Sequence, residues 1–205
     1  MVFVLKKIVS LGSILLAGLV LVGCSGSPSK SSSSSSAADK SSSSKVSKVE
    51  KASSEKASSV TPSDDAENRT WTYKNDVFDA GIETYKFTKS EIRDSVDEGK
   101  KVLVLYCNVT NNSTKEQDPS NIYMVALAYQ KNDTSNVQLN PGMVASDENG
   151  NSPIQKQEDG LNNKLLPGKT VEAVITFELN NDNPVTLEFT NASGTKIGEK
   201  VYQVK

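Results

Sequence analysis

Apolar and polar residues alternate in two runs near the C-terminal end of the chain, and each run predicts a β-strand. In Val171–Leu179 apolar side chains occupy every second position, and most positions between them are Glu or Thr. Val185–Thr190 has the same period of two, and Asn180–Pro184 between the runs is rich in turn residues. Because successive side chains of a strand point to opposite faces, each segment should bury one face and expose the other.

Five further segments favour strands. Val102–Val109 is apolar on both faces at its start, which is typical of a central strand. Ile122–Tyr129 predicts a strand whose bulkier face carries Tyr123, Val125, Leu127 and Tyr129. Weaker strands are expected at Thr70–Phe78, Ile82–Thr88 and Lys196–Val204. About seven short strands separated by Asn, Asp, Gly and Pro, with almost no helical periodicity, predict an all-β sandwich or barrel.

The stretch between Gln130 and Lys169 is irregular. Only Val137–Leu139 and Leu161–Leu166 favour short strands there. A long irregular segment in a small domain often carries function, because a rigid scaffold positions it. We therefore predict a candidate binding loop at Asp147, Glu148, Asn149 and Asn151. The alternative is a solvated crossover between two sheets.

The first 63 residues lack strand patterns. Lys6 and Lys7 precede a mostly apolar run of 15 residues, Ile8–Val22, which is typical of a secretory leader and shorter than the ~20 residues that span a bilayer. Residues 25–63 contain 19 serines in 39 positions, too little apolar surface to offset the entropy of ordering. We predict a disordered linker with a mean reach of roughly 35 Å.

The apolar run ends in Leu21-Val22-Gly23-Cys24, which resembles the lipobox of bacterial lipoprotein precursors. The resemblance implies that a signal peptidase recognises Leu21, Val22 and Gly23, cuts after Gly23, and leaves Cys24 with a diacylglyceryl group on its sulfur. Two acyl chains anchor a protein stably. We expect a signal peptide at 1–23, the lipidated cysteine and linker at 24–67, and a folded domain at 68–205 on the extracellular face of the cell membrane. A transmembrane anchor is the alternative.

The formal net charge of −2 conceals two parts of opposite charge. Residues 25–63 contain six lysines and three acidic residues, whereas residues 64–205 contain 15 basic and 22 acidic residues. Proteins that bind nucleic-acid backbones present a basic face, so no nucleic-acid partner is expected for this acidic domain. The positive linker suits anionic lipids or wall polymers, or merely keeps a serine tract soluble.

The chain has no histidine, which removes the commonest proton shuttle and metal ligand. Cys107 lies in the most apolar segment and is expected to be a buried structural residue rather than a nucleophile. The oxygen-rich loop around Asp147 lacks the ligand spacing of an EF-hand, and no carboxylate pair stands out. We expect no enzyme activity, no metal site and no cofactor apart from the lipid on Cys24.

Three further segments are Val104–Asn111, Leu166–Thr170 and Pro184–Phe189. In their order and pattern they resemble uncharacterised immunoglobulin-like domains of Gram-positive lipoproteins, which are similar to telokin-like secreted antigens. The resemblance implies an immunoglobulin-like antiparallel β-sandwich without the disulfide of antibody domains. It brings no catalytic residues and no ligand.

The function that fits these features best is a cell-surface lipoprotein that displays a non-catalytic binding domain for an unknown protein or cell-wall ligand. One alternative is an immunity or exclusion lipoprotein that protects the cell from a bacteriocin, a phage or a lytic enzyme. A second is a small histidine-independent enzyme of the cell envelope. A solute receptor of an uptake transporter is excluded, because it needs two α/β lobes and the chain has no βαβ pattern.

Overall fold

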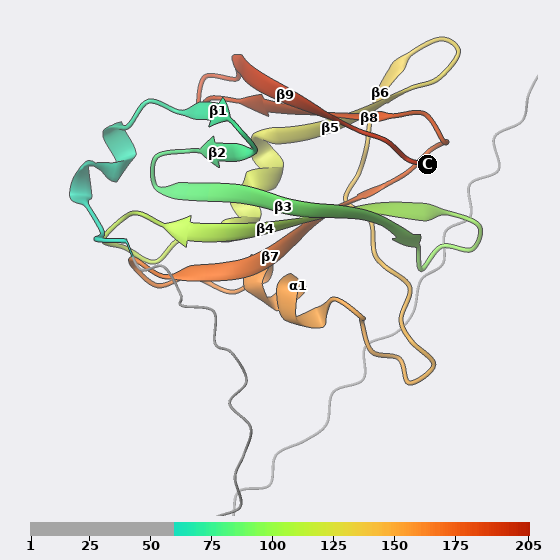
Figure 1. Cartoon of the computed structure of the whole chain (residues 1–205), viewed down its shortest axis with the longest axis horizontal. Coiled ribbons are helices and arrows are strands. Elements are labelled where there is room, and N and C mark those ends of the chain that lie inside the picture. Colours follow the sequence, from blue (N-terminus) through green and yellow to red (C-terminus); the bar gives the residue numbers. More distant parts are fainter. Residues whose placement is uncertain (1–59) are drawn as a thin grey trace, which may run out of the picture. The chain divides into compact units, whose positions relative to one another are not determined.

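The computed structural model describes residues 60–205, and the expected signal peptide, lipobox and most of the linker lie outside these residues. The described part contains nine strands, two 3₁₀ helices and one α-helix (Figure 1). The strands are β1 (Thr72–Lys74), β2 (Val77–Asp79), β3 (Glu83–Asp94), β4 (Lys101–Asn111), β5 (Ala126–Lys131), β6 (Asn136–Gln138), β7 (Thr170–Glu178), β8 (Val185–Thr190) and β9 (Lys196–Tyr202). The helices are η1 (Asp64–Asn68), η2 (Pro119–Met124) and α1 (Gln155–Asn162).

The strands form two antiparallel sheets that pack face to face (Figure 1). The larger sheet has the order β1-β2-β3-β4-β7, and the smaller has the order β6-β5-β8-β9. This arrangement confirms the predicted all-β sandwich. The count exceeds seven because β6 forms and because Thr70–Phe78 is a hairpin rather than one strand. Asn75 and Asp76 have φ angles of 52° and 61° at its turn, and these residue types tolerate the left-handed region better than most.

The main core lies between the sheets and depends on β4. Side chains of β4 at every second position, Leu103, Leu105, Cys107 and Val109, point into it and are at most 1 % exposed. The aromatic ring of Phe189 on β8 faces them and stacks on Tyr73, with ring centroids 4.1 Å apart. Burial on this scale supplies most of the free energy that holds two sheets together.

A second, smaller core covers the opposite face of β4. Val102 and Val104 on β4 and Val174 on β7 pack there against Val144 and Ile154. The covering residues belong to the irregular stretch that follows β6, which crosses the outer face of the larger sheet. This explains why the first half of β4 is apolar on both faces, as the sequence predicted.

The predicted strand at Ile122–Tyr129 is wrong in its start, and its bulkier face is not the buried one. Ile122–Met124 belongs to η2, whose first turn is capped by the Asp118 side chain. The strand begins at Ala126, and the residues that it buries are Ala126, Ala128 and Gln130. The Gln130 amide donates 2.7 Å and 3.0 Å hydrogen bonds to the carbonyl oxygens of Asn183 and Asn181, so its burial leaves no polar group unpaired.

The predicted short strand at Leu161–Leu166 is also wrong. Leu161 belongs to α1, which packs along β7, and only Leu165 forms an isolated β-bridge, with Gln117. Gly160 allows this packing, because a Cβ on it would lie 2.1 Å from the carbonyl oxygen of Glu172. The helix therefore touches the strand backbone directly.

The packed structure begins earlier than the expected boundary at residue 68. Ala66 in η1 is only 1 % exposed, and the Ser63 amide donates a 2.8 Å hydrogen bond to the carbonyl oxygen of Asn112. Val60 and Pro62 lie against Gly168, which has a φ of 67°. Residues 60–67, which we assigned to the linker, thus pack on the end of the sandwich where β3 begins and β4 ends.

We predict that Gly160→Ala lowers the free energy of unfolding by about 1–3 kcal/mol, the usual cost of overpacking. Alanine gains up to about 1 kcal/mol of helix propensity, but the contact with the Glu172 carbonyl outweighs this gain. Urea unfolding followed by circular dichroism measures the change. Asn162→Ala, at an exposed position of the same helix, is the control and should change stability by less than about 0.5 kcal/mol. An unchanged midpoint for Gly160→Ala would contradict the close approach.

Candidate ligand-binding surface

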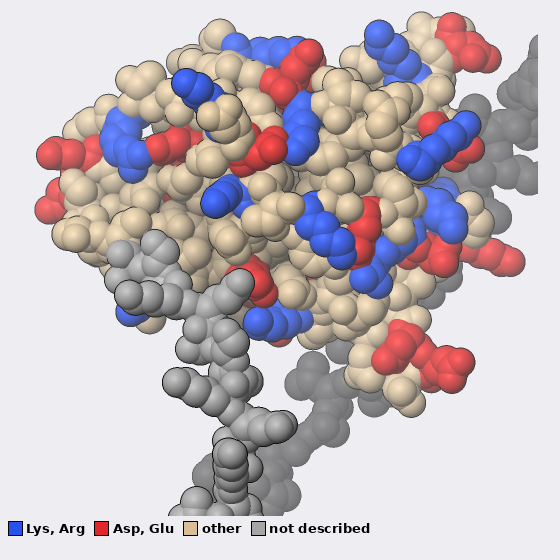
Figure 2. Space-filling model, in the orientation of Figure 1, with Lys and Arg blue, Asp and Glu red and all other residues tan. Residues whose placement is uncertain are grey.

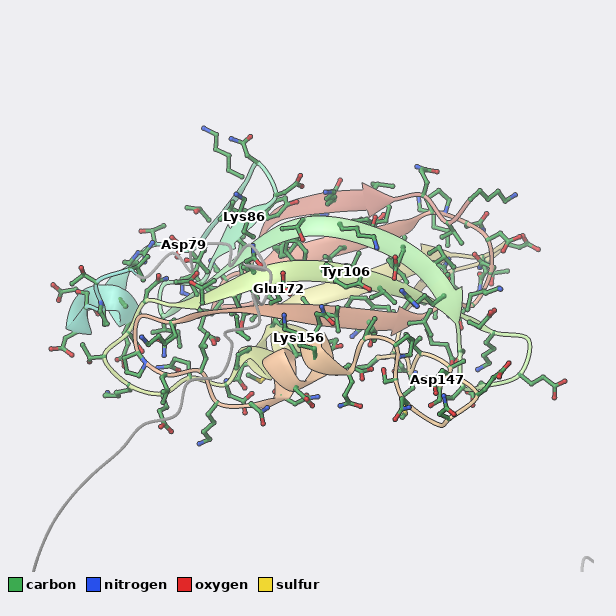
Figure 3. The ribbon with its side chains drawn as sticks, turned by 60° about the horizontal axis from the view of Figure 1, so that its bottom comes forward. Asp79, Lys86, Tyr106, Asp147, Lys156 and Glu172 are labelled. Carbon is green, nitrogen blue, oxygen red and sulfur yellow. The ribbon has the colours of Figure 1, made fainter. Side chains whose placement is uncertain are left out.

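The polar groups of the predicted binding loop bond mainly to one another. Asp147, Glu148, Asn149 and Asn151 are all exposed, and Figure 3 shows Asp147 in a loop outside the strands. The Asp147 carboxylate accepts hydrogen bonds of 2.9 Å from the backbone amides of Asn149 and Asn151. These donors, that of Asn151 foremost, hold the pKa of Asp147 below its ordinary value. The carboxylate thus shapes the turn, and a ligand-binding role for the loop remains a prediction.

An open groove of about 510 Å³ lies beside this loop, between the end of β3 and the stretch that covers the sheet. It is lined by Glu91, Ile92, Arg93, Asp94, Val144, Ala145, Ser146 and Pro153. Val144 is anchored in the smaller core, so one wall is fixed by packing. The other wall is a β-strand, and the groove is therefore built mostly on rigid elements.

Glu91 is the centre of a charge cluster on the wall formed by β3. It forms ion pairs with Lys89 and Arg93 and accepts a 2.8 Å hydrogen bond from the hydroxyl of Tyr106 on β4. Partial burial disfavours its ionised form, but hydrogen bonds from Lys89, Tyr106 and Arg93 outweigh that effect and lower its pKa to about 2. A carboxylate with three donors is a poor proton acceptor at neutral pH.

Charges of both signs mix over much of the domain. Figure 2 shows basic and acidic side chains interspersed on one face. On the outer face of the larger sheet, Figure 3 shows Tyr106 near the middle, with Lys156 of α1 next to Glu172 of β7. The Nζ of Lys156 lies 3.3 Å from the Glu172 carboxylate. Exposed pairs of this kind contribute little stability.

A second titratable group lies inside the opposite end of the sandwich. Glu83, at the start of β3, is 3 % exposed and accepts a 2.8 Å hydrogen bond from the Tyr85 hydroxyl. Its other carboxylate oxygen is buried without a hydrogen-bond partner. Burial, opposed by the Tyr85 hydrogen bond and aided by the charge of Asp118, raises the pKa of Glu83 to about 7.

Cys107 is buried, as the sequence predicted, and is a free thiol. Burial raises the pKa of this thiol to about 12, so the nucleophilic thiolate is scarce at neutral pH. Within residues 60–205, no group of three or more acidic or cysteine side chains is placed to hold a metal ion. Over the same residues, no helix combines the length and apolar character that crossing a bilayer requires.

Sequence reasoning missed the groove residues of β3, because the strand was expected to end at Thr88. Beyond that point Lys89, Glu91 and Arg93 alternate with Ser90 and Ile92. Charged residues at every second position were the available signal for a strand with one solvated face. The predicted residues Leu21, Val22, Gly23 and Cys24 lie outside the described residues.

The fold and groove together define an antiparallel β-sandwich with an open surface at one end of its larger sheet. A predicted lipoprotein of Staphylococcus aureus has a similar structure, with a TM-score of 0.58 and 19 % sequence identity over 66 % of this chain and 92 % of that one. A protein of Enterococcus faecalis, solved by NMR, is similar with a TM-score of 0.51 and 16 % identity over 67 % of this chain and 96 % of that one. At these identities the likeness establishes the fold.

Residues 58–191 match the family described as a domain of unknown function, DUF5067, and the chain belongs to this family. No curated protein matches the chain in sequence. The expected resemblance to an uncharacterised β-sandwich domain is therefore confirmed. The family match begins at residue 58, close to the start of the described structure.

We predict that Glu83 makes stability fall as pH rises. Its folded pKa of about 7 lies above the ordinary value of 4.5, so the folded state holds the proton more tightly. The stability that protonation provides is complete below about pH 4.5 and is lost as pH rises through about 7. Glu83→Gln, which keeps the shape and stays neutral, should be more stable than the parent at pH 8 by up to about 3 kcal/mol and equal to it near pH 4.

Urea unfolding across pH 4 to 8 tests this expectation. Glu98→Gln, on the exposed hairpin between β3 and β4, removes one negative charge without altering a buried site and serves as the control. Parallel pH profiles for the parent and Glu83→Gln would contradict this prediction. They would show that the Glu83 carboxyl ionises at its ordinary pKa in the folded state.

Proposed function

We propose that this protein is a lipid-anchored protein of the extracellular cell surface whose β-sandwich is a non-catalytic binding module. The observation that carries the proposal is the open groove along the end of β3, one wall of which is a rigid strand. The lipobox at Leu21–Cys24 supports the anchoring. The absence of histidine and the saturation of Glu91 by three donors support binding rather than acid–base catalysis.

The geometry suits display from a tether. The chain enters the sandwich at Val60, beside Gly168 and the residues that precede β7. The start of β3 lies at the same end, because Glu83 pairs with Asn111 and the Ser63 amide bonds to Asn112. β3 then runs 12 residues to Asp94, which at about 3.3 Å per residue places the groove roughly 30 Å from the attached end.

We predict that Cys24→Ser abolishes lipidation. Cells of a Gram-positive host that express the full chain are grown with a radioactive fatty acid, and the parent protein should be labelled, shortened by its leader and cleaved by protease added to intact cells. Cys24→Ser should be unlabelled and keep the leader, because the thiol that accepts the diacylglyceryl group is missing.

Cys107→Ser is the matched control, since Cys107 is the only other cysteine and is buried in the core. It should label like the parent. Equal labelling of the parent and Cys24→Ser would refute lipid anchoring at this residue, and protection of the parent from external protease would refute surface display.

A further inference from the structure

Half of β3 has an open side. β2 pairs with β3 only over Thr84–Lys86, and at the far end Val144 forms an isolated antiparallel bridge with Ser95. Between these two contacts, residues 89–93 pair with β4 on one side and Thr88 forms a bulge. On the other side, residues 88–93 pair with no strand of residues 60–205. The open side is therefore a recess about six residues long, bounded at both ends by chain that occupies the next strand position.

The backbone groups that face this recess follow from the hydrogen bonds at its end. The carbonyl oxygen of Asp94 accepts a 2.8 Å bond from the Ala145 amide on the open side, whereas the Ser95 amide donates to Lys100 on the other side. Alternate residues of a strand direct their N–H and C=O groups to the same side. Ser90 and Ile92 are in phase with Asp94, so both of their amides and both of their carbonyls face the recess.

Two hollows flank the recess on opposite faces of the sheet. The groove described above lies at residues 91–94, next to the outward side chains of Glu91 and Arg93. A smaller pocket of about 140 Å³ lies at residues 87–90, and it is lined by Asp76, Phe87, Thr88, Lys89, Ser90, Lys200 and Tyr202. The buried hydroxyl of Tyr202 has no hydrogen-bond partner within the described residues.

We propose that the recess of β3 binds an extended polypeptide segment of a partner protein, which pairs with Ser90 and Ile92 as an added strand. This proposal rests on the proposed function and specifies its ligand class. One side chain of the segment enters the groove beside Glu91, Arg93 and Val144, where a polar group fits. Another, on the opposite face of the added strand, enters the pocket lined by Asp76, Lys200 and Tyr202, where a small polar group fits.

The recess selects a single segment rather than a second copy of this chain. β2 and the bridging residues around Val144 each stand one strand spacing, about 4.8 Å, outward of β3. When two copies face each other, β2 and the residues around Val144 of one copy meet those of the other. This contact occurs before the two recessed edges reach hydrogen-bonding distance. A free chain terminus or loop of a partner has no flanking strand of this kind, so it can reach the edge of β3. Strand addition of this kind gains affinity from main-chain hydrogen bonds and selectivity from pockets for alternate side chains.

The protein already shows the first step of such pairing. Residues 143–145 lie against residues 94–96 through the hydrogen bonds Val96 N–H to Met143 and Ala145 N–H to Asp94. The chain then leaves the sheet, because the turn closed by the Asp147 carboxylate directs it away. The position next to Ser90 and Ile92 therefore stays open for another chain.

Selection from a phage-displayed library of random heptapeptides, performed on the full chain in detergent, tests the proposal. Selected peptides should alternate apolar and polar residues. With a saturating selected peptide, amide hydrogen exchange at Ser90 and Ile92 should slow at least tenfold, whereas exchange in the exposed Asn132–Ser135 turn should not change. Ile92→Pro removes one amide that faces the recess and should weaken peptide binding at least tenfold. Asp133→Ala, in the exposed Asn132–Ser135 turn away from the recess, should bind like the parent.

Several results would overturn the proposal. These are failure to select any peptide, binding without slowed exchange at Ser90 and Ile92, and unchanged affinity in Ile92→Pro. In the absence of peptide, exchange at these amides could also slow as the protein concentration rises. That result would show that a second copy of the chain binds the recess instead. Because exchange is measured on the unaltered protein, the test stands even if Ile92→Pro folds poorly. Fatty-acid labelling of Cys24 reports on anchoring separately, so a failure of strand addition and a failure of the proposed function give different results.

Discussion

The long antiparallel pairing of β3 with β4 determines the rest of this structure. It runs without interruption from Glu83 opposite Asn111 to Asp94 opposite Lys101, except for one bulge at Thr88. β4 is paired on its other side by β7, so its backbone is fully used and both of its faces need cover. The smaller sheet covers one face, and Val144 and Ile154 cover the other. β3 extends well beyond the end of its neighbour β2, and this difference in strand length creates both the recess and the groove.

The sequence predicted those strands in which side-chain size and burial agree. β8 buries one apolar face, and the apolar first half of β4 correctly indicated a central strand. For β7 the expected exposed face was wrong, because Val174 and Thr176 on that face are also buried. The prediction failed where inward positions hold small or polar residues. Ala126, Ala128 and Gln130 point inward, and the carbonyls of Asn181 and Asn183 satisfy the glutamine amide. Helix α1 carries few apolar residues, and its packing depends on the missing side chain of Gly160, which no periodicity reveals.

The candidate site was harder to predict than the fold, for two physical reasons. Acidic residues in a polar loop suggest a ligand site, but in Asp147 the carboxylate meets the loop's own amides, a common use of Asp in turns. The groove joins Glu91 to Pro153, residues far apart in the sequence, so only the folded chain brings them together. The recess is even harder to predict from the sequence. Every residue except proline carries the same backbone donor and acceptor, and only the pairing of the strands decides which of these groups remain unpaired.

The charges at this surface bear on how it would recognise a partner. Glu91 pairs with both Lys89 and Arg93, and Tyr106 completes the cluster, so this row of β3 carries a net charge of only +1. Charged side chains on an open strand edge also disfavour non-specific pairing with the strands of other proteins. The recess instead offers directional groups, two amides and two carbonyls in a fixed line, with one hollow on each face of the strand. Main-chain pairing accepts many sequences, so discrimination would rest on the groove near Val144 and the pocket near Tyr202, which side chains of a partner strand must fill.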